Sequence, residues 1–210
     1  MRGGGRGPLP LAGALTVWSW VAVLAAVVLV PSPVEAHLVT TGLGPYYDGI
    51  GHLLVTPQDL LPLMALALLG GLAGPDRARQ LLFAVPVAWF AGGLAGLTQS
   101  QEILAPILTA LTILVVGGLV AADRKLPSAA TLAVGTLIAL VHGFLNGTAM
   151  SSAGLGLAAL AGIAGTAFVL MALGGAWAVA WRSGWTRIAL RVAGSWIVAT
   201  GMLMLGWAFR

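Results

Sequence analysis

The chain has no cysteine and few charged side chains. Of its 210 residues only 8% are charged. The absence of cysteine excludes disulfides, thiolate zinc sites and thiol redox chemistry, so any metal site must use imidazole, carboxylate, amide, thioether or backbone ligands. The formal net charge is +4, and the basic residues lie in short loops between apolar runs. We therefore interpret them as signals of membrane orientation and expect no nucleic-acid partner.

Apolar residues make up 59% of the chain, and the mean hydropathy is +1.00. A soluble domain cannot bury so much apolar surface, whereas a bundle of membrane helices exposes it to lipid. The 30 glycines favour close packing between such helices. The fold class we predict is an all-α polytopic membrane bundle, with about six transmembrane helices in residues 57–74, 80–97, 103–122, 128–148, 154–181 and 188–209.

The first 36 residues have the pattern of a secretory signal peptide. Arg2 and Arg6 precede an apolar stretch over residues 11–30, and small residues stand near Ala36. We predict cleavage after Ala36, which leaves residues 37–210 as a single transmembrane domain. The apolar stretch is long for a signal peptide, so an uncleaved anchor is the alternative.

Basic residues alternate between the loops that join the six segments. They follow the first, third and fifth segments, whereas residues 98–102 and 146–153 contain no Lys or Arg. The positive-inside rule places the basic loops in the cytoplasm. We therefore expect a multi-pass protein of the bacterial inner membrane with its mature N-terminus outside.

Polar and ionisable residues recur near the outer ends of these segments. Such residues are costly in lipid and usually face a cavity, a partner or an ion path. Imidazoles and carboxylates suit divalent nickel, cobalt, copper or zinc better than calcium. The candidate metal ligands are His37, Asp48, His52, Asp59, Glu102, His142 and Asn146.

Several of these residues also have a structural interpretation. A helix that begins here would have its N-cap at Thr56, its first position at Pro57 and its third position at Asp59. The Asp59 carboxylate would then help to cap the helix. Glu102 would be an acidic residue at a helix start. His37 would either chelate a metal with its free amine or belong to a mobile tail. Pro57 argues against one continuous helix, so we expect a short turn or re-entrant piece to carry His52.

The chain resembles the HupE/UreJ family. The resemblance rests on Ala36-His37, on the segment from His52 to Asp59 and Leu61, and on His142-Gly143-Phe144-Leu145-Asn146-Gly147, which matches the family motif H-G-x-x-H-G. It covers essentially the whole mature chain, and Glu102 resembles a Glu of the family. Three positions depart from the family pattern, because two family histidines are Leu60 and Asn146 here and a family proline is Leu53.

The resemblance implies a permease for a divalent transition-metal ion, nickel or cobalt, taken up for hydrogenase and urease maturation. The alternative is a membrane accessory or assembly protein that binds a metal such as copper, or a metalloenzyme subunit, without transport. No tightly bound cofactor is expected, and an oligomer remains open. The chain has no H-E-x-x-H, Gly-x-Ser-x-Gly or phosphate-binding loop motif, so we expect it not to be an enzyme or an ATPase.

Overall fold

A computed structural model describes residues 40–99 and 105–209, and all the regular secondary structure in these ranges is helical. This confirms the all-α fold class. The predicted signal peptide lies outside the described residues. The helices are α2 (Pro45–Val55), α3 (Pro57–Ala73), α4 (Pro75–Gly96), α5 (Ala105–Ala122), α6 (Ser128–Ser152), α7 (Gly156–Ala180) and α8 (Gly184–Ala208).

Five of these helices, α4 to α8, are long and apolar enough to cross a membrane by themselves. The first predicted span differs, because α3 has only 17 residues. It meets the requirement for a span only together with α2, from which it is bent by 75°. The described part of the chain is thus a multi-pass membrane protein with five spans, or six if the bent pair counts as one.

The break between α2 and α3 has a local cause. Thr56 is extended, with φ −97° and ψ 95°, and Pro57 occupies the first turn of α3, where its missing N–H costs nothing. The helix therefore begins where the sequence predicts. The predicted side-chain cap is wrong, however, since the Thr56 side chain makes no capping hydrogen bond and the Asp59 carboxylate turns into the bundle instead.

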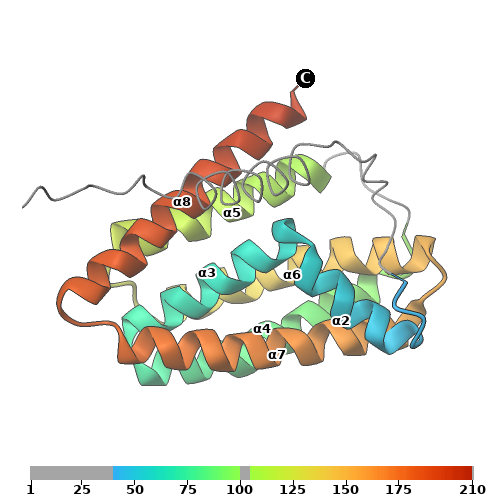
Figure 1. Ribbon diagram of the computed structural model, residues 1–210, viewed down its shortest axis with the longest axis horizontal. Helices are drawn as coiled ribbons and strands as arrows, with labels where there is room; N and C mark the ends of the chain where they lie inside the picture. The colour runs from blue at the N-terminus through green and yellow to red at the C-terminus, as the bar shows by residue number, and fades with distance from the viewer. Residues whose placement is uncertain (1–39, 100–104, 210) are drawn as a thin grey trace, which may run out of the picture. The chain divides into compact units, whose positions relative to one another are not determined.

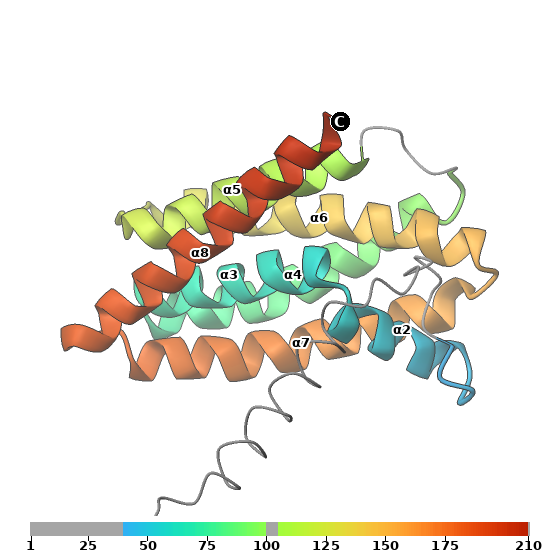
Figure 2. The same ribbon diagram turned by 45° about the horizontal axis from the view of Figure 1, so that its top comes forward.

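The helices pack in pairs that do not follow chain order. In both views of the ribbon, α5 and α8 lie together along one side of the bundle, α7 lies on the opposite side, and α3 and α6 run between them (Figures 1 and 2). Helix α2 packs against α7, and α4 packs against both α6 and α7. This arrangement brings α3, α5 and α6 side by side.

Glycines permit the close approach of α4 and α6. A Cβ atom added to Gly143 would lie 2.0 Å from the Trp89 carbonyl oxygen, and one added to Gly147 would lie 2.2 Å from the Gly93 carbonyl oxygen. The two backbones thus touch directly, as small residues allow in membrane bundles. The contact determines the position of the α6 face that carries His142 and Asn146.

Candidate functional site

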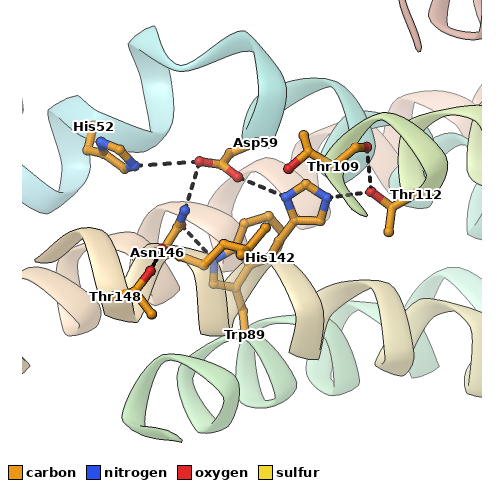
Figure 3. A network of polar contacts seen from close by, with 9 residues as sticks. His52, Asp59, Trp89, Thr109, Thr112, His142, Asn146 and Thr148 are labelled. Atoms are coloured by element: carbon orange, nitrogen blue, oxygen red, sulfur yellow. Dashed lines mark hydrogen bonds and ion pairs between the residues drawn. The ribbon is translucent and has the colours of Figure 1, made fainter. Parts of the chain in front are cut away.

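Asp59 is the centre of a buried polar network near the start of α3. Its side chain is almost fully buried, yet both carboxylate oxygens have partners. Oδ1 lies 2.8 Å from Nδ1 of His142, and Oδ2 accepts a hydrogen bond of 2.8 Å from Nδ2 of Asn146 (Figure 3). A buried carboxylate is tolerated only with such partners.

His142 and Asn146 project from α6 one turn apart, as their spacing predicts. His142 is completely buried, and its Nε2 lies 2.8 Å from Oγ1 of Thr112 on α5. The Thr112 hydroxyl also donates to the Thr109 carbonyl oxygen at 2.8 Å. The imidazole therefore joins α3 to α5 and has a polar partner at each ring nitrogen.

Trp89 on α4 orients the Asn146 side chain through a hydrogen bond. Its indole Nε1 donates a 3.0 Å hydrogen bond to Oδ1 of Asn146, and its ring lies 5.3 Å from the His142 ring at a tilt of 33°. The amide of Asn146 is thereby oriented with its oxygen toward Trp89 and its nitrogen toward Asp59. Both polar atoms of this side chain are used within the network.

Sequence reasoning missed Trp89 and Thr112. The only sequence signal for Trp89 is that a tryptophan in an apolar run needs a partner for its N–H group. Thr112 stands in an apolar helix, where a threonine commonly bonds to its own backbone. Neither residue type distinguishes a site from ordinary helix packing.

His52 approaches the same carboxylate from α2. The bend at Thr56 turns the last turn of α2 back toward α3, so that Nε2 of His52 lies 3.5 Å from Oδ2 of Asp59 (Figure 3). This nitrogen is buried, and the described residues offer it no hydrogen-bond partner. A buried polar atom without a partner is unfavourable and calls for an explanation, such as a water or an ion.

A cavity of about 560 Å³ opens beside His52 and Asp59. It lies at the end of the bundle where α3 and α5 begin and where α6 and α8 end. Its walls combine polar groups near α2 and α3 with apolar side chains of α5 and α8. The lining residues are His52, Gln58, Asp59, Ala105, Pro106, Thr109, Leu145, Asn146, Thr148, Ala149, Met204, Trp207 and Ala208.

Within residues 40–99 and 105–209, no group of three or more His, Cys, Asp or Glu side chains is arranged to hold a metal ion. His52 and His142 instead meet Asp59 separately, one at each carboxylate oxygen. Coordination by all three would require His142 to leave its hydrogen bond with Asp59. The donor types fit a divalent transition metal, but their arrangement is that of a hydrogen-bonded network.

Asp48, another predicted ligand, makes its contacts away from this network. Asp48 lies near the start of α2, where its Oδ1 accepts hydrogen bonds from the backbone N–H and the hydroxyl of Thr41, at 2.6 and 2.7 Å. These contacts fasten the segment before α2. His37 and Glu102 lie outside the described residues, so their proposed role as ligands stays a prediction.

Comparison with known proteins agrees with the motifs. The family model described as HupE / UreJ protein matches residues 25–204, which is most of the chain. No curated protein and no solved structure matches it. The chain therefore belongs to the HupE/UreJ family, a family of membrane transporters, not enzymes, that is linked to nickel and cobalt uptake.

Proposed function

We propose that the protein is an inner-membrane permease for a divalent transition-metal ion, nickel or cobalt, and that the ion is captured in the cavity beside Asp59. The observation that carries this proposal is the buried Nε2 of His52, which has no hydrogen-bond partner among the described residues and lies 3.5 Å from a carboxylate oxygen. A cation placed between imidazole nitrogen and carboxylate would satisfy both groups. Both side chains line the cavity.

The three ionisable residues have different roles in this proposal. His52 and Asp59 receive the arriving ion, because they face the cavity and Nε2 of His52 makes no hydrogen bond within the described residues. His142 becomes a ligand when the ion displaces it from its hydrogen bond with Asp59. Asn146 orients Asp59 and is not a ligand, since its oxygen accepts from Trp89 and its amide nitrogen donates to Asp59.

The route inward would follow the seam between α3, α5 and α6. Beyond His142 the seam contains Thr112, and Thr131 is buried in the half of α6 near its start. A second cavity, of about 430 Å³, opens at the opposite end. With the cavity beside Asp59 outside, the membrane potential would favour cation entry by roughly 2.3 kcal/mol per charge for each 100 mV. No nucleotide-binding motif is needed for such a carrier.

A second candidate is a membrane accessory or assembly protein that binds a metal without moving it. The closed network around Asp59 favours this alternative, because every polar atom of His142 and Asn146 already has a partner. Opening the seam would break several buried hydrogen bonds. Such a protein would bind nickel or cobalt but would show no flux.

The decisive experiment measures nickel binding and nickel uptake in proteoliposomes for wild type and for His52→Phe. Phenylalanine keeps an aromatic ring but removes Nε2, and the hydrogen bonds among Asp59, His142 and Asn146 stay intact. We expect binding and initial uptake to fall about tenfold or more. Tyr47→Phe, an exposed position on the same helix, is the matched control and should leave both unchanged.

The outcomes separate the two candidates. Binding that depends on His52 together with measurable uptake supports the permease. Binding that depends on His52 without uptake supports the accessory protein. Nickel binding and uptake that are equal in wild type and His52→Phe contradict the assignment of this site.

A further inference from the structure

The end of the bundle opposite Asp59 has a cavity with strongly basic walls. Its volume is about 430 Å³, and it lies where α3 and α5 end and where α4, α6 and α8 begin. Leucines from α3 and α5 form its apolar floor. Its charged lining consists of five basic side chains and one carboxylate, namely Arg77, Arg124, Lys125, Arg182, Arg187 and Asp123.

The single carboxylate is already neutralised. Arg187 donates to both oxygens of Asp123, from Nε at 2.5 Å and from Nη2 at 2.8 Å, in the bidentate geometry that arginine favours. Asp76, in the first turn of α4, has its Oδ1 atom 3.6 Å from Nη1 of Arg79, and its side chain is strongly exposed. Four basic side chains of the cavity therefore remain without a compensating carboxylate among the described residues.

These remaining charges come from separate elements and meet around one space. Arg77 belongs to the first turn of α4, Arg124 and Lys125 to the connection between α5 and α6, and Arg182 to the connection between α7 and α8. Like charges gathered in this way repel one another, and an anion between them removes the repulsion. Guanidinium groups match the oxygen geometry of phosphate particularly well.

Exposed tryptophans lie in and next to the connection between α7 and α8, which contributes Arg182 to this cavity. Trp181 and Trp185 flank the connection between α7 and α8, and Trp185 is 73% exposed. The Trp181 ring lies 4.7 Å from that of Trp177. Tryptophan gathers at membrane interfaces because its ring is apolar and its N–H is polar. Basic recesses between helices at this depth suit anionic headgroups.

We propose that this basic cavity binds the phosphate headgroup of an anionic phospholipid, with the acyl chains lying along the apolar surface of the bundle. The inference rests on the cavity, its unbalanced charge and the adjacent tryptophans, and it is independent of the proposed metal transport. For a permease it has one consequence. A bound phosphate would lower the electrostatic barrier that the four uncompensated basic residues present to a cation leaving at this end.

The test measures binding of phosphatidylglycerol to the detergent-solubilised full chain by native mass spectrometry. Wild type is compared with the double variant Arg124→Gln/Lys125→Gln, whose altered side chains are exposed and leave the helix packing untouched. Each basic residue near a membrane surface strengthens the binding of anionic lipid roughly fivefold. The loss of two such residues should therefore weaken the binding of phosphatidylglycerol about 30-fold. Phosphatidylcholine should bind weakly to both proteins.

The control variant is Arg79→Gln, which removes one positive charge from an exposed arginine outside the cavity lining. It should bind phosphatidylglycerol with nearly the wild-type affinity. Equal binding to wild type and the double variant would overturn the proposal, as would an equal loss in the control. Inorganic phosphate at matched concentration is the third probe. If it occupies the site while phosphatidylglycerol does not, the ligand is a free anion and the lipid assignment is wrong.

Discussion

At the scale of single residues, the polar centre is a chain in which each side chain orients the next. Trp89 holds the Asn146 oxygen, the Asn146 nitrogen holds one oxygen of Asp59, and His142 holds the other. Breaking one link leaves a buried polar group without a partner, which typically costs about 1–3 kcal/mol. Asn146 thus serves as a bridge between Trp89 and Asp59.

Asn146→Asp tests this arrangement at one atom. The substitution keeps the side-chain shape and the oxygen that faces Trp89, but it replaces the donor nitrogen 2.8 Å from Asp59 by an acceptor oxygen. Two carboxylates would then face each other in a buried site, so we expect a lower melting temperature than in wild type. A divalent cation between them relieves the repulsion. Nickel should therefore raise the melting temperature of the variant more than that of wild type.

Magnesium is the control cation for this experiment, since it prefers oxygen ligands and retains its waters more strongly than nickel. Equal stabilisation by magnesium and nickel would show that charge alone acts and that no imidazole takes part. A variant that nickel does not stabilise at all would contradict a cation site at Asp59.

The sequence predicts four members of the network but not how they meet. His52, Asp59, His142 and Asn146 stand out because polar residues in apolar runs need a reason. Their connection to Trp89 depends on the packing of α4 against α6, which no local pattern encodes. The contact between Thr112 and His142 cannot be predicted from the sequence for the same reason. Residue type locates candidates, and tertiary contact decides which of them act together.

At the scale of helices, hydropathy predicts where the membrane spans lie, and Pro57 predicts the break before α3. The ends of α5 and α6 fall within a few residues of the predicted apolar runs. The sequence predicts a short turn or re-entrant piece around His52, and the structure has there an 11-residue helix bent by 75° from α3. Isolated helices of that length are marginal, so its stability must come from packing. Gly49 and Tyr46 make the backbone contacts with α7 that supply it.

The contact between α4 and α6 leaves no room for a larger residue at its glycines. Gly143→Ala would place a methyl group 2.0 Å from the Trp89 carbonyl oxygen, so the helices must separate. We expect a loss of about 1–3 kcal/mol in unfolding free energy and a weaker hydrogen bond from Trp89 to Asn146. Thermal unfolding in detergent measures the first effect and tryptophan fluorescence the second.

Gly118→Ala in α5 is the matched control, since a Cβ atom there meets nothing within 4 Å. Alanine also favours helix more than glycine does, so this variant should be as stable as wild type or slightly more stable. Equal destabilisation by the two substitutions would show that backbone contact between α4 and α6 is not the cause.

At the scale of the whole molecule, the sequence predicts on which side of the membrane each loop lies, but it does not predict which helices pack against each other. The basic loops indicate which helix ends lie on the same side. The structure places the start of α5 and the end of α6, which border the two loops without Lys or Arg, at the end that holds Asp59. That α5 pairs with α8 and α4 with α6 depends on which small-residue faces fit each other (Figure 2). Two cavities at opposite ends of the seam are a consequence of this pairing.

The orientation of the bundle is open to a direct test, because a chain without cysteine is a clean background for single cysteines. Ala153→Cys lies between α6 and α7, and Ser183→Cys lies between α7 and α8; both positions are exposed. The positive-inside rule predicts that a membrane-impermeant maleimide labels the first variant in intact spheroplasts and the second only after permeabilisation. The reverse pattern would place the Asp59 cavity in the cytoplasm. The membrane potential would then oppose cation release from that cavity to the outside, and the protein would have to be an exporter or an accessory factor instead of an uptake permease.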